Sequence, residues 1–172
     1  MHEMVIYGVS FDLVGKQPIV LLKTADGNKF LPIWIGHPEA AAILMKLQGA
    51  ATPRPLTHDL VTDMLSQLDA QVTRITVTEL KENTFYASIT VQQDGSEIEI
   101  DSRPSDAIAL AVRAEAPIFA AEEVIEESAI EFEGEGEEVN EEEVQEIVSE
   151  FKQFLENVTP DEFAEAEGDG ES

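Results

Sequence analysis

Hydrophobic and polar positions along the chain follow two periods, one typical of strands and one typical of helices. Alternating or continuous runs of apolar and β-branched residues predict six strands, at residues 4–14, 18–24, 29–36, 71–80, 84–93 and 97–101. Helical spacing predicts three helices, at residues 37–49, 58–70 and from about 106 to about 114. A short extended piece and a short helix are expected within residues 116–128.

Two of the predicted helices carry apolar stripes that we expect to be buried. The stripes consist of Ala40, Ile43, Leu44 and Leu47, and of Leu60, Met64, Leu65 and Leu68. Thr57 is expected to cap the second helix, and Pro32 places the third strand at an edge or a bulge. Trp34 alternates with isoleucines, so it faces the other side of its strand, where a second packed layer or an interface would cover it.

The order of the predicted elements suggests an internal repeat. The stretches "IWIGHPEAAAILMKL" and "IEIDSRPSDAIALAV" both predict a strand, a polar turn with a proline and a helix of small residues. With one gap, Glu39 matches Asp106 and Ile33 matches Ile100. The predicted fold class is therefore α+β, with mixed or antiparallel sheets and a duplicated unit of a β-meander plus a helix. Chance similarity is the competing explanation of the repeat.

The C-terminal part differs from the rest in its pattern. We expect one α+β domain over residues 1–130, an acidic linker over 131–143 and an amphipathic helix over 144–163. An acidic, disordered tail should occupy 164–172. The apolar side of the helix combines Val144, Ile147, Val148, Phe151, Phe154, Leu155 and Val158. So large a stripe must dock on the main domain or on a partner.

Charge is concentrated in the same part of the chain. Of the net charge of -26, residues 1–118 account for -6 and residues 119–172 for -20. Passive binding of nucleic acid by the whole chain is disfavoured, because phosphate affinity comes from Lys and Arg. The chain has no Cys, no secretory signal pattern and no apolar run long enough for a membrane span, so a cytoplasmic protein without membrane contact is the default expectation.

Three clusters of polar residues lie where the predicted helices begin. They are His37 and Glu39; Arg54, Thr57, His58 and Asp59; and Asp101, Ser102, Arg103, Ser105 and Asp106. Because helix N-termini present free N–H groups, clusters that converge would form a phosphate pocket, with Arg54 and Arg103 as clamps. Carboxylates among them are suited to Mg²⁺ or Mn²⁺, and His58 is suited to acid–base catalysis.

Each cluster also has a purely structural explanation. Ser102 or Ser105 is more simply a helix cap than a nucleophile, and Asp106 and Glu39 suit the helix dipole. Arg103 opposes the dipole at its position, so it needs either an ion pair with a neighbouring carboxylate or a bound anion.

The stretches "LPIWIGHPEAAAI", "RPLTHDL" and "IDSRPSDAIALAVR", in this order, resemble the bifunctional nuclease (BFN) domain family over about residues 4–130. The resemblance implies an α+β domain that often self-associates and a nuclease activity on RNA and DNA. The matching positions are Gly36, Glu39, Ala40, Arg54, Pro55, Thr57, His58, Asp59, Asp101, Arg103, Pro104, Ser105, Asp106 and Ala107. His37 falls where the pattern is loose.

These residues are compatible with two functions. The first is a nuclease with Mg²⁺ or Mn²⁺ assistance, whose expected catalytic residues are His58, Asp59, Asp101, Arg103 and Asp106. In it, Arg54, Arg103 and Ser105 would bind phosphate, and Glu39, Asp101 and Asp106 would hold the metal. The alternative is a non-enzymatic, homo-oligomeric binding or regulatory module, with a dimer favoured in either case.

Overall fold

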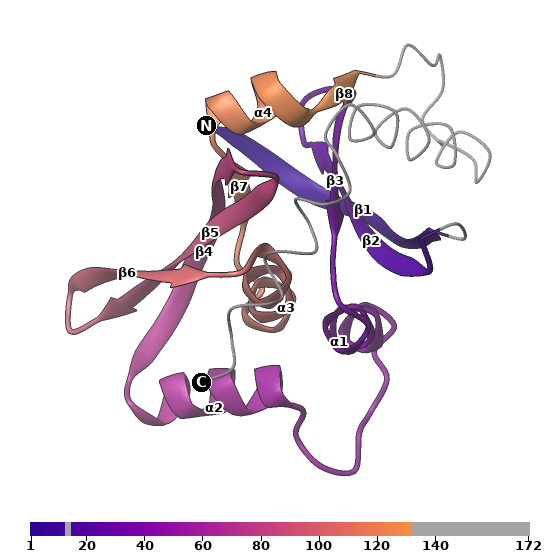
Figure 1. Cartoon of the computed structure of the whole chain (residues 1–172). Helices are drawn as coiled ribbons and strands as arrows, with labels where there is room; N and C mark the ends of the chain where they lie inside the picture. The colour runs from indigo at the N-terminus through magenta and orange to yellow at the C-terminus, as the bar shows by residue number, and fades with distance from the viewer. Residues whose placement is uncertain (13–14, 132–172) are drawn as a thin grey trace, which may run out of the picture.

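The computed structural model describes residues 1–12 and 15–131 and contains strands and helices in an α+β arrangement (Figure 1). The strands are β1 (His2–Asp12), β2 (Gln17–Thr24), β3 (Lys29–Trp34), β4 (Ala70–Lys81), β5 (Thr84–Gln93), β6 (Ser96–Ser102), β7 (Ile118–Ala120) and β8 (Ile130–Glu131). The helices are α1 (His37–Leu47), α2 (Thr57–Gln67), α3 (Pro104–Ala114) and α4 (Glu122–Ser128). The α+β class is confirmed.

All of these strands join one eight-stranded sheet in the order β6-β5-β4-β7-β1-β2-β3-β8. Two antiparallel meanders, β1–β3 and β4–β6, form its halves, and each is followed by a helix. The short strand β7 joins the halves, because it pairs antiparallel with β1 and parallel with β4. The predicted pattern of a meander plus a helix therefore occurs twice, with α2 inserted between the two units.

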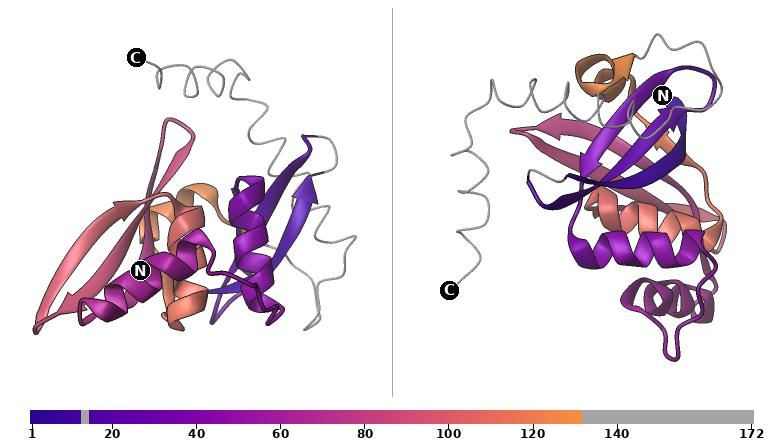
Figure 2. Two further views of the ribbon diagram at one scale, coloured as in Figure 1. Left: turned by 90° about the horizontal axis from the view of Figure 1, so that it is seen from below. Right: turned by 90° about the vertical axis from the view of Figure 1, so that its right-hand side faces the viewer.

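The core lies between the sheet and helices α1, α3 and α4. Helix α3 is buried along most of its length, and its alanines let it approach β4 and β5 closely (Figure 2). Ile108 of α3 and Ile75 of β4 are both fully buried, as is Ile43 of α1. This packing brings the N-terminal ends of α1, α2 and α3 into mutual reach.

The predicted burial of the α2 stripe is wrong for three of its four residues. Leu60, Met64 and Leu68 have exposed fractions of 53%, 55% and 62%. Helix α2 packs on α3 and the start of β4 through Val61 and Leu65 instead. Because α2 lies beyond the edge of the main core, only the part of its apolar surface next to α3 is covered. Leu47 at the end of α1, also predicted to be buried, has an exposed fraction of 49%.

The predicted helix caps also need correction. Thr57 is the first residue of α2 rather than its cap, and the Asp59 carboxylate accepts a hydrogen bond from the Leu56 N–H at 2.8 Å. Neither Ser102 nor Ser105 caps α3, since the N-cap is Arg103 and no side chain caps this end. An acidic side chain in the first turn of a helix can reach back to the N–H of the N-cap residue, as Asp59 does here.

The domain boundary predicted at residue 130 falls within β8, one residue before the described part ends. The predicted linker beyond Glu131, the helix at 144–163 and the tail at 164–172 lie outside the described residues. Within residues 1–12 and 15–131, no helix has the length and apolar character needed to cross a membrane.

Candidate functional site

Four of the predicted site residues meet where α1, α2 and α3 begin, and we call Glu39, His58, Arg103 and Asp106 the acid–base cluster. The His58 Nε2 lies 2.8 Å from the Asp106 Oδ1. Arg103 donates from Nε to the Asp106 Oδ2 and from Nη2 to the Glu39 Oε1, each at 2.7 Å. The three polar clusters of the sequence thus converge, through one arginine that bridges two carboxylates.

The local backbone explains how these side chains reach one another. Arg103 is extended, at φ -67° and ψ 142°, and Pro104 starts α3 directly after it, so the guanidinium lies beside the first turn. At Gly36, a Cβ atom would collide with the Glu39 carboxylate, which folds back over this residue. The glycine therefore permits the position in which Glu39 meets Arg103.

Exposure differs sharply within the acid–base cluster. The side chains of His58 and Glu39 are each 13% exposed, whereas that of Arg103 is 66% exposed. Arginine has five N–H donors, and the two carboxylates use the Nε donor and one at Nη2. Arg103 therefore presents donors toward solvent, whereas the His58 imidazole is mostly buried.

The charges of the cluster shift the ionisation of its members. Burial disfavours the charged form of Asp106, but the hydrogen bonds from Arg103 and His58 outweigh it and lower the pKa of Asp106. The hydrogen bond that Arg103 donates to Asp106, against the effect of burial, raises the pKa of Arg103. Asp106 is therefore held as a carboxylate next to the His58 imidazole.

Asp59 belongs to a second contact, with a residue that the sequence analysis missed. Its Oδ1 accepts a hydrogen bond at 2.7 Å from the Nε of Arg113, whose side chain is 5% exposed. Arg113 also donates to the carbonyls of Ala109 and Ala42, so it ties α2 and α1 to α3. Burial opposes the ionisation of Asp59, but the Leu56 N–H and Arg113 lower its pKa.

The position of Arg113 in the last turn of α3 does not by itself indicate a special role, because a basic residue there already suits the helix dipole. The available signal was its position four residues after Ala109, on the buried side of an alanine-rich helix. The Asp59 carboxylate is thus engaged by Leu56 and Arg113 rather than by a member of the acid–base cluster. This contact joins α2 to α3, so it supports a structural role for Asp59 instead of the predicted catalytic one.

Other predicted site residues are not brought into the cluster. Asp101 alternates with Ile100 on β6 and so projects from the opposite face of the sheet. Arg54 is exposed in the loop before α2. Ser105 is 6% exposed, which closes its hydroxyl to a phosphate. His37 contacts the carbonyl of Lys16 at 3.1 Å instead of a site residue.

The described residues do not form the predicted metal site. Glu39 and Asp106 do lie together, but the Arg103 guanidinium occupies the position between their carboxylates. Asp101, the third predicted ligand, lies on the other face of the sheet. Within the described ranges, no group of three or more His, Cys, Asp or Glu residues is arranged to hold a metal ion. No catalytic step is therefore assigned to a metal here.

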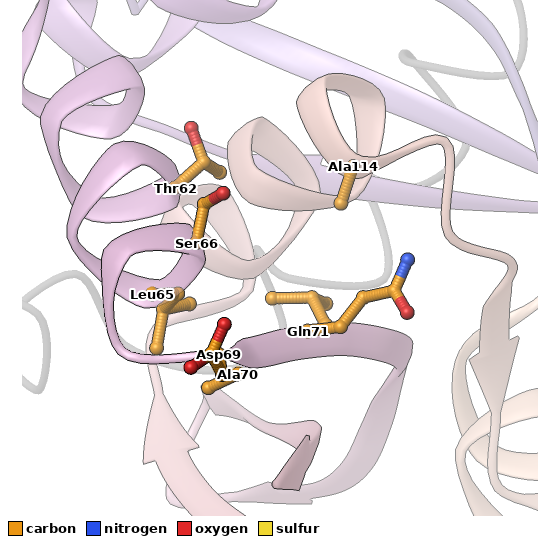
Figure 3. Close-up of a pocket in the computed structure, with 8 residues that line it drawn as sticks. Thr62, Leu65, Ser66, Asp69, Ala70, Gln71 and Ala114 are labelled. Atoms are coloured by element: carbon orange, nitrogen blue, oxygen red, sulfur yellow. The ribbon is translucent and has the colours of Figure 1, made fainter.

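A pocket of about 430 Å³ opens farther along α2, away from the acid–base cluster (Figure 3). Thr62, Leu65 and Ser66 of α2 line one side, and Asp69, Gln71 and Ala114 lie around them. None of the predicted site residues lines it. Its mixture of one carboxylate, hydroxyls and an amide defines no particular ligand.

The acid–base cluster has the components of a proton-transfer site. The Asp106 carboxylate orients the His58 imidazole, and the exposed guanidinium of Arg103 next to it can bind an anion such as a phosphate. The two carboxylates of Glu39 and Asp106, however, outnumber the one guanidinium of Arg103, so the cluster has no excess positive charge. The geometry alone therefore fits either a catalytic site or a set of ion pairs that joins three helices.

Comparison with known proteins adds information that the geometry lacks. The model of the bifunctional nuclease domain matches residues 20–133. An uncharacterised protein of Mycobacterium tuberculosis (strain ATCC 25618 / H37Rv) is 38% identical over 168 residues, which cover 95% of this chain and 98% of that protein. Bifunctional nuclease 1 of Oryza sativa subsp. indica is 30% identical over 103 residues, 58% of this chain and 31% of the rice protein.

Bifunctional nuclease 1 of Arabidopsis thaliana is 29% identical over 105 residues, 59% of this chain and 32% of the plant protein. Residues 20–133, which the family model matches, contain the starts of α1, α2 and α3 and all four members of the acid–base cluster. On this match, the chain belongs to the bifunctional nuclease domain family.

Proposed function

We propose that this protein hydrolyses phosphodiester bonds in RNA or single-stranded DNA at the acid–base cluster. The observation that carries the proposal is the His58–Asp106 contact of 2.8 Å beside the exposed Arg103, in a chain of the bifunctional nuclease domain family. The relatives named as bifunctional nucleases support the reaction class. The cytoplasmic location that the sequence predicts is part of the same proposal.

Each cluster member has a role in the proposed reaction. Arg103 binds a non-bridging phosphate oxygen through its solvent-facing N–H groups. His58, oriented by Asp106, takes a proton from the water that attacks phosphorus, and the bond to the leaving oxygen breaks. The leaving oxygen takes up a proton, so that water and the diester give a monoester and an alcohol. Glu39 positions Arg103.

The test compares cleavage of a fluorescent single-stranded RNA and the matching DNA by the full chain and by variants. We expect His58→Ala and Arg103→Ala to lose about 100-fold or more of the rate, the typical contribution of one acid–base group. Arg103→Lys should recover only part of it, because lysine lacks the planar fork. Arg74→Ala is the matched control, since Arg74 pairs with Glu99 on the far face of the sheet.

Equal rates in the wild type and in both cluster variants would assign the cleavage to a contaminant or to another site. Far-UV circular dichroism and thermal unfolding of each variant separate lost chemistry from lost folding. Arms with Mg²⁺, with Mn²⁺ and with EDTA test the predicted metal assistance. Full activity in EDTA would contradict that prediction while leaving the cluster's role in place.

A non-enzymatic, self-associating module is the second candidate, and the exposed apolar residues of α2 and β6 favour it. Ile98 and Ile100 of β6 are 44% and 42% exposed. Both pair with core residues of β5, so they lie on the sheet face that carries the helices, as does the α2 stripe. Exposed apolar residues gathered on one side of a protein are typical of an interface.

A second copy of the chain is the occupant that we propose for this α2–β6 surface. The described chain ends at β8, at the sheet edge opposite β6 and roughly 34 Å away by seven strand spacings of about 4.8 Å. The chain's own C-terminal segment would have to cross the whole sheet to reach it. Glu97, Glu99 and Asp101 on the other face of β6 oppose pairing of two β6 edges, so contact through the apolar face is favoured.

A further inference from the structure

The meander β1–β3 has a second apolar face, which we call the outer face and define by Ile19, Leu21, Phe30 and Trp34. The register places Ile19 beside Trp34, and Leu21 beside Pro32, on the same side of the sheet. Their neighbours Val20, Leu22, Leu31 and Ile33 point to the opposite side and belong to the main core with the helices. Strand β2 is therefore apolar on both faces.

Three of the four residues of the outer face are buried, and the hydrophobic cluster of Leu21 and Phe30 includes no residue of a described helix. Ile19, Leu21 and Phe30 have exposed fractions of 0%, 2% and 1%. Leu21 and Phe30 form a hydrophobic cluster that is separate from the main core, and among the described residues only Tyr7 and Ile130 extend it. Both of these lie on strands. A sheet that is apolar on both faces needs a second covering layer.

The chain itself leaves the described structure at this face. Strand β8 pairs with Lys29 and Phe30 of β3, and residues 132–172 follow it directly. Residues 132–143 can span up to roughly 40 Å, whereas a three-stranded meander is only about 10 Å wide. A segment that starts near residue 144 therefore reaches every part of the outer face without strain.

The sequence of residues 144–158 fits this surface in size and chemistry. As a helix it would measure about 22 Å, close to the roughly 26 Å of the eight-residue strand β2. Its apolar stripe includes Phe151, Phe154 and Leu155, and its other side carries several glutamates. The outer face bears Lys23, whose Nζ lies 6.0 Å from the centre of the Phe30 ring.

We propose that residues 144–158 dock as an amphipathic helix on the outer face of the β1–β3 meander, in the same molecule. The short tether makes this contact intramolecular and favours it over the same contact with a second copy. The face that carries the helices, and the acid–base cluster with it, then remains open, because the docked segment lies on the other side of the sheet.

The single tryptophan of the chain, Trp34, reports on this contact in the full-length protein. We expect the double variant Phe151→Glu/Phe154→Glu to shift Trp34 emission to longer wavelength and to increase its quenching by acrylamide. The matched control, Gln145→Glu/Gln153→Glu, adds the same charge on the polar side of the segment and should change neither. Far-UV circular dichroism checks that each variant keeps its fold.

An unchanged Trp34 signal in the phenylalanine variant would overturn the proposal. So would quenching that depends on protein concentration in the wild type, which would place a second copy on the outer face. Because the chain lacks cysteine, Lys23→Cys with Glu150→Cys gives an independent test by a short thiol crosslinker. A crosslink within one chain supports the docked segment, and a crosslink only between chains contradicts it.

Discussion

Single residues join the three helices at two places, and these places differ in burial. The acid–base cluster presents Arg103 to solvent, whereas Arg113 is enclosed and meets Asp59, Ala109 and Ala42. An exposed ion pair contributes little to stability, but a buried guanidinium without its carboxylate is costly. The Asp59–Arg113 pair is therefore the structural one, and Arg103 is the residue available for binding.

Removing Asp59 tests this division. Asp59→Ala deletes the partner of Arg113 and the acceptor of the Leu56 N–H, so we expect the free energy of unfolding to fall by about 2 to 4 kcal/mol. Urea unfolding followed by circular dichroism measures it. Asp63→Ala, an exposed position on the same helix, should change stability by less than about 0.5 kcal/mol. An equal fall in the free energy of unfolding in both variants would contradict a structural role of the Asp59–Arg113 pair.

Stability should also depend on pH through Asp106. Its pKa is lowered in the folded protein, so at acidic pH the unfolded chain binds more protons. The stabilisation is complete above the ordinary pKa of about 4 and is lost as pH falls below it. We expect Asp106→Asn to reduce this acid-induced loss, measured by urea unfolding from pH 7 to pH 3. An unchanged pH profile would show that the carboxylate is not stabilised by folding.

At the level of elements, α2 and β6 determine which surface is open for association. Leu60→Glu/Met64→Glu places charge on residues that are already exposed, so the fold should persist. If a second copy covers the α2–β6 surface, light scattering should give a dimer for the wild type and a monomer for this variant. Gln67→Glu on α2 is the control. A variant with the mass of the wild type would exclude this surface as the dimer contact.

The periodicity of the chain predicted most elements but not all of their surroundings. The three long helices and both meanders follow from the spacing of apolar residues. Periodicity shows that a helix has an apolar side, but it cannot show how much of that side a neighbour covers. Leu60, Met64 and Leu68 are exposed because α2 lies at the end of the core, which is a property of its packing.

For the molecule as a whole, the negative charge of the C-terminal residues should lower the rate of the proposed nucleic-acid cleavage by repelling the substrate. Residues 159–172 carry acidic groups and no Lys or Arg, and they follow the proposed docked segment. Their deletion should raise the cleavage rate several-fold at low ionic strength, because repulsion of the substrate weakens. The gain should vanish at about 0.5 M salt, where screening is strong. A gain that persists at high salt would indicate a direct contact instead.

The sequence by itself determined most of the elements, the α+β class, the concentration of acidic residues after position 118 and the three polar clusters, but not the strand β8. Those features depend on local spacing and composition. Only the tertiary structure decided which cluster members meet. Arg103, Asp106, His58 and Glu39 come together because the three helices converge, whereas Asp101 is directed to the other face by the pleat of β6. Successive residues of a strand point to opposite faces of the sheet, so a shift of one residue moves a side chain to the other face. The sequence motif alone does not show which face each residue occupies.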